Sequence, residues 1–258
     1  MFFINFYNMT KENNTLEKYG DHFQQKSKYT RENLPKHRLD WSNKPDTYKT
    51  YNNLIEIIDL PKLDFPKDVD FWNTIKNRHS TRKFGQNPVS LEDLGLILYG
   101  ISGINRNLPH FEFRTVPSAG GLYPIETYPI VNNISGLDSG IYHYNIKKHS
   151  LEYLKRGDFR KKIAEACLGQ VIAYHSAVNF VWTAVIERSK WKYLQRCYRY
   201  IYLDAGHIGQ NLYLVGEAID LGVCTIGAIF DDELNKILDI DGKKETAIYV
   251  GVVGTKTN

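Results

Sequence analysis

The chain has 258 residues, of which 42% are hydrophobic, and its 33 basic and 29 acidic side chains leave a formal net charge of +4. This length can bury a sizeable core in one principal domain, and the basic residues are spread out rather than gathered into the patch that nucleic-acid binding requires. No segment approaches the roughly 18 consecutive apolar residues that span a bilayer, and the N-terminal residues lack the features of a signal peptide. We therefore predict a cytoplasmic protein that binds neither nucleic acid nor a membrane.

The three cysteines, Cys167, Cys197 and Cys224, are far apart and stand outside any C-x-x-C pattern. An odd number at such spacing argues against a disulfide framework and against a structural zinc site. We predict no metal centre.

The N-terminal part of the chain differs in composition from the rest. Residues 1–50 are polar, rich in Asn, Lys and Tyr, and lack a sustained apolar period, which predicts an arm with short helical pieces that could lie over a partner subunit. Residues 52–68 contain two prolines and are expected to form an irregular linker. The predicted boundary separates an arm and linker, residues 1–66, from a main domain, residues 67–258.

Two helices are predicted at the start of the main domain. The first covers residues 70–79, with Asp70 available as its cap. The second begins at Ser90, which with Asp93 resembles a capping box. It continues through apolar residues at helical spacing and stops at Gly103, the apolar positions being Leu91, Leu94, Ile97, Leu98 and Ile101.

The middle of the chain mixes strands with helices. Glycines and flanking prolines predict a loop, and alternating apolar residues predict strands. The expected elements are a loop over residues 117–124, a strand over 125–133, a hairpin over 140–157, a helix over 159–172 and a strand over 177–186.

The longest predicted helix covers residues 194–219. It is apolar or small on more than one face, which is typical of a helix buried all round, at the centre of a sandwich or at a subunit interface. His207, among these residues, is expected to be buried and hydrogen-bonded. A helix over residues 231–240 and a strand over 247–253 follow. One antiparallel sheet with several helices indicates an α+β fold rather than a doubly wound one.

Two of four short segments that could carry chemistry lie in the first half of the main domain. Arg78, Ser80 and Arg82 offer guanidinium and hydroxyl donors to a phosphate or a ribityl chain, or they form a solvated basic helix end. In residues 117–124, paired glycines let the backbone approach a planar ligand and Ser118 can donate to a carbonyl, or the segment is a tight turn before a strand.

The other two segments flank the long helix. Residues 222–228 are small and could present backbone N–H groups to an electron-rich ring, or they form an ordinary connection between helix and strand. Lys192 and Tyr193 could act together as a general base, or they form the exposed start of the helix.

The order of these segments closely resembles the SagB-type dehydrogenases of the nitroreductase superfamily. RHSTRKF, PSAGGLYPIE, KYLQRCYRYIYLDAGHIGQNLYL and LGVCTIGAI follow one another within roughly residues 71–254. The resemblance implies an α+β, nitroreductase-like sandwich whose central, antiparallel-type mixed sheet is flanked by helices. It also implies an intertwined homodimer, formed through long central helices, with FMN at the interface.

The resemblance further implies particular contacts to FMN. The phosphate and ribityl end would be held by Arg78, Ser80, Arg82 and Lys256. The isoalloxazine would be lined by Pro117, Ser118, Ala119 and Gly120 of the partner subunit. The backbone amides of Ile226 and Gly227 would lie near flavin N5 and O4.

Family members with a Lys-Tyr pair before the long helix resemble azoline oxidases. This resemblance implies that Lys192 and Tyr193 are catalytic. They would transfer a proton while a hydride passes to flavin N5. We predict an FMN-dependent dehydrogenase of a peptide-derived or related small substrate, which a partner of a modification complex could deliver. One alternative is an NAD(P)H-dependent reductase of nitro or quinone compounds. Another is a flavin-binding scaffold subunit of a peptide-modification complex.

Overall fold

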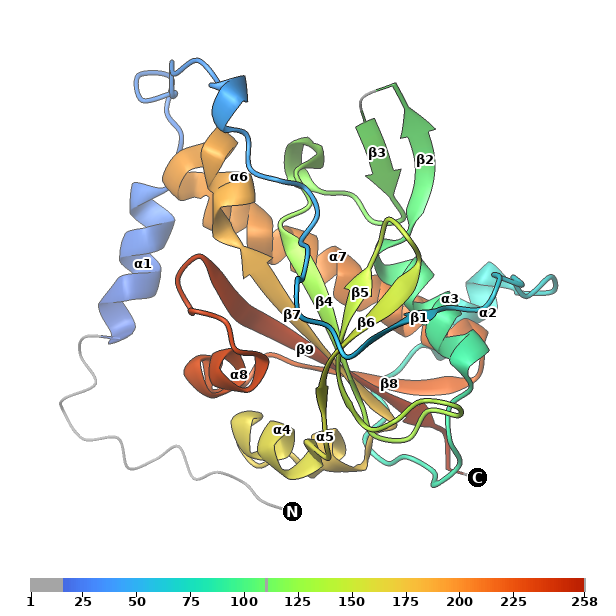
Figure 1. Cartoon of the computed structure of the whole chain (residues 1–258). Helices are drawn as coiled ribbons and strands as arrows, with labels where there is room; N and C mark the ends of the chain where they lie inside the picture. Colours follow the sequence, from blue (N-terminus) through green and yellow to red (C-terminus); the bar gives the residue numbers. More distant parts are fainter. Residues whose placement is uncertain (1–15, 110, 258) are drawn as a thin grey trace.

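The computed structural model describes residues 16–109 and 111–257 (Figure 1). The first 15 residues of the predicted arm lie outside the described residues. The centre of the fold is a seven-stranded sheet in the order β1-β6-β5-β4-β7-β9-β8, in which every pair of neighbouring strands is antiparallel. Its strands are β1 (Glu56–Asp59), β4 (Ile125–Val131), β5 (Gly140–Asn145), β6 (Ser150–Arg156), β7 (Val178–Val185), β8 (Leu221–Ile226) and β9 (Glu245–Thr255).

Helices cover both faces of this sheet (Figure 1). One layer contains α3 (Leu91–Ser102) and α7 (Cys197–Ala218), and the other contains α4 (Arg160–Ala166), α5 (Val171–His175) and α8 (Asp231–Leu238). Strand β7 contributes side chains to the core on both faces of the sheet, because successive side chains of a strand point to opposite faces. Phe180 and Trp182 pack with the α3 and α7 layer, whereas Val181 packs with the other. The predicted α+β sandwich, with helices on both faces of its sheet, is confirmed.

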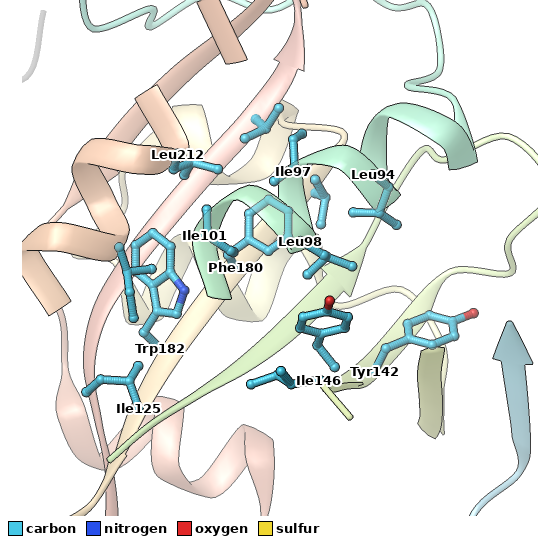
Figure 2. Close-up of a cluster of buried hydrophobic side chains, with 14 of the residues drawn as sticks. Leu94, Ile97, Leu98, Ile101, Ile125, Tyr142, Ile146, Phe180, Trp182 and Leu212 are labelled. Carbon is cyan, nitrogen blue, oxygen red and sulfur yellow. The ribbon is translucent and has the colours of Figure 1, made fainter. Parts of the chain in front are cut away.

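The larger core lies between the sheet and helices α3 and α7. Figure 2 shows the apolar side chains of α3 meeting Phe180, Trp182 and Leu212 from β7 and α7. All of the predicted apolar positions of α3 except Leu91 are fully buried. The helical spacing read from the sequence therefore identifies the face of α3 that contacts the sheet.

Two helix caps are formed as predicted. The Asp70 carboxylate accepts hydrogen bonds from the backbone N–H groups of Trp72 and Asn73 at the start of α2 (Phe71–Asn77). The Ser90 hydroxyl oxygen accepts from the Asp93 N–H at 3.0 Å and donates to the Asp93 carboxylate at 2.7 Å. These local bonds satisfy N–H groups that the first turn of a helix leaves free.

The prediction of one helix over residues 159–172 is wrong, because the structure has two short helices there, α4 and α5. Leu168 and Gly169 between them have φ angles of 55° and 71°. A right-handed helix cannot continue through this left-handed backbone region, so the chain turns and starts a new helix at Val171.

Within one chain the long helix is not buried all round, which leaves the predicted alternative of a subunit interface. The actual helix is α7, and one side of it is open: Tyr202 is 57% exposed, Leu203 is 59% exposed, and Gly206 is exposed. His207, expected to be buried, is exposed on the same side. The sheet and α3 cover only the opposite side of α7.

Several elements were not predicted. Strand β1 lies within the expected irregular linker, β8 occupies residues expected to be a connection, and α6 (Ile186–Tyr193) precedes the long helix. A two-stranded hairpin of β2 (Ile104–Leu108) and β3 (Phe111–Arg114) projects from the end of α3 (Figure 1). The division of the chain at residue 66 stays a prediction, although β1 pairs with β6 of the main sheet.

The described part of the arm contains α1 (Leu16–Lys26) and a short 3-10 turn, η2 (Trp41–Asn43). It lies against its own chain: the Trp191 indole N–H donates to the Asp40 carbonyl at 2.9 Å, and Lys49 Nζ is 2.5 Å from the Glu245 carboxylate. None of the helices in residues 16–109 and 111–257 is both long and apolar enough to cross a membrane.

Candidate functional site

The predicted phosphate-binding segment runs from the end of α2 along strand β8. The Thr81 N–H donates to the Val223 carbonyl at 2.8 Å, and the Ser80 hydroxyl oxygen lies 2.9 Å from the Tyr213 hydroxyl of α7. The Arg78 guanidinium lies over the Tyr213 ring, 5.1 Å from its centre. Tyr213 therefore connects the segment to α7.

Tyr213 also contacts the end of β8, where two further cofactor residues were predicted. Its hydroxyl accepts from the Thr225 N–H at 3.0 Å, and the Tyr249 hydroxyl donates to Thr225 Oγ1 at 2.6 Å. Ile226 and Gly227 follow directly, the first buried and the second exposed. Tyr213 thus contacts Arg78, Ser80 and Thr225, the residue that precedes Ile226 and Gly227.

The guanidinium groups of this cluster have no carboxylate partner. Within the described residues, neither Arg78 nor Arg82 forms an ion pair, and Arg82 is exposed with only a 3.5 Å contact to the Ser80 carbonyl. Two such groups beside a hydroxyl fit a phosphate, because guanidinium groups present several N–H donors to an anion.

Lys256, unlike Arg78 and Arg82 in the described part of the chain, forms ion pairs with acidic side chains. Its Nζ lies 3.2 Å from the Glu217 carboxylate and 3.0 Å from that of Asp220, at the C-terminal end of α7. Burial would lower the pKa of Lys256, but these two carboxylates outweigh it and raise the pKa. Two acidic groups already balance its charge, so the structure does not present Lys256 as a free cation for the phosphate.

The 117–124 loop is held by a carboxylate that sequence reasoning missed. Buried Asp204 of α7 accepts from the Ser118 hydroxyl at 2.6 Å and from the Ala119 N–H at 3.2 Å. Burial raises the pKa of Asp204, although these two hydrogen bonds favour its charged form. The sequence signal is a single acidic residue within the apolar part of a long helix.

The predicted catalytic pair meets this loop. A β-carbon at Gly120 would lie 2.6 Å from the Tyr193 hydroxyl oxygen and 2.9 Å from Lys192 Nζ. Gly120 also has a φ of 64°, so both the backbone conformation and the close approach of these side chains call for glycine here. Tyr193 is half-buried, and burial raises its pKa.

Within one chain the predicted phosphate-binding residues and the 117–124 loop lie apart. Arg78 and Ser80 contact α7 at Tyr213, whereas the loop contacts α7 at Asp204, nine residues earlier. That separation corresponds to about 13 Å along the helix axis and half a turn around it. In the figure, the loop before β4 and the end of β8 lie toward different ends of α7 (Figure 1).

A cavity of about 560 Å³ lies beside the loop. Its walls include Pro117, Ser118 and Gly121 of the loop together with Arg106 and Arg114 of the β2–β3 hairpin. In the described parts of the chain, no three His, Cys, Asp or Glu side chains are grouped as metal ligands. Because Arg106, Arg114 and Ser118 line it, the cavity is a polar and cationic pocket at the edge of a glycine-containing loop.

Comparisons with known proteins place the chain among relatives of known family. A protein of Methanocaldococcus jannaschii that carries a nitroreductase name is 31% identical over 199 residues, which cover 77% of this chain and 96% of that protein. The trifolitoxin-processing protein TfxB of Rhizobium leguminosarum bv. trifolii is 27% identical over 214 residues, and the match covers 77% of this chain and 57% of TfxB. The chain thus spans little more than half the length of TfxB.

A solved structure from Anabaena variabilis, also named as a nitroreductase, superposes with a TM-score of 0.76 at 30% identity and covers 90% of this chain and 45% of that one. A model of the nitroreductase family matches residues 75–255, which include both groups of site residues. The chain belongs to the nitroreductase family.

Proposed function

We propose that the protein is an FMN-dependent oxidoreductase that oxidises an azoline or a related peptide-derived substrate. The observation that carries this proposal is the meeting of Lys192 and Tyr193 over Gly120. It brings a possible proton acceptor to the loop whose residues Pro117, Ser118 and Ala119 would line the isoalloxazine. Similarity to a protein named for trifolitoxin processing supports a peptide-derived substrate.

The residues around Tyr213 fit the other end of FMN. Arg78 and Arg82 supply guanidinium groups without carboxylate partners in the described chain, and Ser80 supplies a hydroxyl. Gly227, which is exposed and has no side chain, leaves room for a planar ring at the end of β8. When bound, FMN supplies the acceptor for the hydride that leaves the substrate.

A second copy of the chain would complete the site. The Arg78 group and the Ser118 group lie half a turn apart on α7, and the exposed side of that helix, with Leu203 and Gly206, lies between them. A homodimer formed over this side would place the Ser118 loop of one subunit near the Arg78 group of its partner. Apolar side chains left open on a long helix also favour such an interface.

Removal of a hydride requires removal of a proton as well. The Lys192 amine lies beside the loop as the group to accept that proton, and the Tyr193 hydroxyl is close enough to Gly120 to orient the reacting group. Asp204 does not contact the reacting groups but keeps the loop in position through Ser118 and Ala119.

The test is substrate-driven flavin reduction in a stopped-flow instrument. Lys192→Ala and Tyr193→Phe should retain FMN and lose about 10²–10⁴-fold in rate, the typical contribution of a general base. Lys190→Ala is the matched control, because Lys190 lies on the same helix but pairs with Glu187 at the surface. Rates within a few-fold of wild type for both variants would rule out this mechanism.

The second candidate is a reductase of nitro or quinone compounds that consumes NAD(P)H. The nitroreductase name of the 31% identical relative favours it. Steady NAD(P)H consumption with a nitro or quinone acceptor, unaffected by Lys192→Ala, would support this function over the first.

The alternative function, a scaffold subunit of a modification complex, gives a different expected result. Peptide modification would stop when the protein is deleted but continue when Arg82 and Arg78 are replaced and FMN is lost. Loss of modification in both cases supports the enzyme.

A further inference from the structure

Arg114, at the end of β3, is a buried cation without a partner. It is 6% exposed, its Nε makes no hydrogen bond, and its guanidinium forms no ion pair within residues 16–109 and 111–257. Burial lowers the pKa of Arg114, and the charge of Glu126 offsets only part of this effect. Burying an uncompensated charge costs free energy, so such a group is kept in a fold only where something repays that cost.

The neighbouring acidic groups are already engaged. The Glu126 carboxylate contacts Arg188 at 2.5 Å and His143 at 3.0 Å, and Glu112 accepts a hydrogen bond from the Tyr48 hydroxyl. Glu126 is close enough to act on the charge of Arg114, but no carboxylate among the described residues forms an ion pair with its guanidinium.

Two aromatic rings lie beside the Arg114 guanidinium. The group lies 4.5 Å from the centre of the Tyr123 ring and 5.6 Å from that of Tyr48. Its backbone N–H donates to the Tyr123 hydroxyl at 3.0 Å. Rings that contact the faces of a guanidinium leave its N–H edge available, which is the edge that binds a carboxylate with two parallel hydrogen bonds.

Arg114 lines the 560 Å³ cavity that also contains Pro117 and Ser118 of the candidate site. Arg106 and Asn105 lie on the same wall, and the Arg106 guanidinium stacks 4.3 Å from the Phe113 ring centre. The cavity thus joins two guanidinium groups to the loop that meets Lys192 and Tyr193, with no acidic side chain in its lining.

We propose that Arg114 binds a carboxylate of the substrate, so that the protein acts on an acidic peptide segment or on a free peptide C-terminus. This proposal rests on the proposed function for the identity of the pocket as a substrate site. A bound carboxylate would neutralise Arg114 and hold the substrate beside the 117–121 loop. Arg114 is accordingly a specificity-determining residue.

Binding can be measured by calorimetry without turnover, using two pairs of capped amino acids. N-acetyl-glutamate methylamide and N-acetyl-glutamine methylamide test a side-chain carboxylate, and N-acetyl-alanine and its amide test a terminal one. We expect one acidic probe to bind about 10- to 100-fold more tightly than its neutral partner, the range given by a charge-assisted hydrogen bond.

Arg114→Met should abolish the preference and leave the FMN content unchanged, and it should raise the melting temperature because it removes an uncompensated charge at similar volume. Arg114→Lys should keep part of the preference, since it retains the charge without the planar group. Arg156→Met is the matched control, because Arg156 is 68% exposed and pairs with Asp138 at the surface.

Equal binding of acidic and neutral probes to the wild type would overturn the proposal. So would a lower melting temperature in both Arg114 variants, which would make Arg114 a structural residue, or loss of FMN from them, which would assign it to the cofactor. Acidic probes that bind through Arg114 while the Lys192 variants turn over normally would sustain this proposal and refute the proposed mechanism.

Discussion

Arg78 and Arg82, at and just after the end of α2, lie beside the Ser80 hydroxyl and form no ion pair in the described chain. Arg82→Ala should weaken FMN retention about 10- to 100-fold, because a hydrogen bond to a charged group contributes about 1.5–3 kcal/mol. FMN released on denaturation, measured per chain after extensive dialysis, checks this. Lys83→Ala is the control, because Lys83 is an exposed neighbour. Full FMN occupancy in both Arg78→Ala and Arg82→Ala would contradict the phosphate assignment.

A second group at the residue scale is His143, which is buried between two carboxylates. Its Nδ1 is 2.7 Å from Glu152 and its Nε2 is 3.0 Å from Glu126. Burial alone would lower the pKa of His143, but the hydrogen bonds and charges of the two carboxylates outweigh it and raise the pKa above 6.5. The folded state therefore holds this proton more tightly than the unfolded state does.

Stability should depend on pH accordingly. The contribution of His143 is complete below the unfolded-state pKa of about 6.5 and is lost as pH rises through the higher folded-state pKa, at up to about 1.4 kcal/mol per pH unit. His143→Gln should flatten this dependence and cost about 3 kcal/mol, since it removes the cation that lies between two buried carboxylates. Urea unfolding at a series of pH values measures both effects. Exposed His175, changed to Gln, should leave the curve as in the wild type, and an unchanged slope in His143→Gln would disprove the account.

At the scale of elements, the junction after α6 has an unusual backbone. Leu194 begins a 3-10 turn, η4 (Leu194–Arg196), and its backbone has φ 49° and ψ −137°. Its side chain is 44% exposed, so core packing does not account for this conformation. A residue with a β-carbon is strained in this region, and strain of about 1–3 kcal/mol is typical where function depends on position. The neighbouring residue is Tyr193.

Leu194→Gly should therefore be more stable than Leu194→Ala by about 1 kcal/mol, because both variants lose the side chain and only glycine relieves the strain. Thermal and urea unfolding of the pair give this difference. Greater stability of the alanine variant would show that the junction is not strained.

At the scale of the whole molecule, the open side of α7 should be covered by a second subunit. Light scattering should give twice the chain mass of 29.9 kDa for the wild type. Leu203→Glu should produce monomers and release FMN, because it places a charge in an apolar contact. Val171→Glu is the matched control: Val171 is also 59% exposed but lies on α5, in the opposite helical layer. A wild-type chain that stays monomeric with FMN bound would refute the dimer.

The features that could be predicted from the sequence depend on residues close together in the chain. The Asp70 and Ser90 caps involve partners two or three residues away, and the buried face of α3 follows from a repeat within 12 residues. The order of the four segments likewise indicates the family, although each segment by itself also fits an ordinary structural role. Local hydrogen bonding and periodicity suffice for such features.

Other features were decided by contacts between distant residues. Ser80 meets Tyr213 across 133 positions and Ser118 meets Asp204 across 86, and neither pair has a local signal. Strand β8 is a short run whose hydrogen bonds with β9 make it a strand, and the covered side of α7 depends on where the sheet and α3 pack. The absence of an acidic partner for Arg114 in the described chain is likewise visible only in three dimensions. By itself the sequence determined the two helix caps, the buried face of α3 and the family; the tertiary structure decided which side chains meet and which remain free, because burial and charge compensation are properties of the packed molecule.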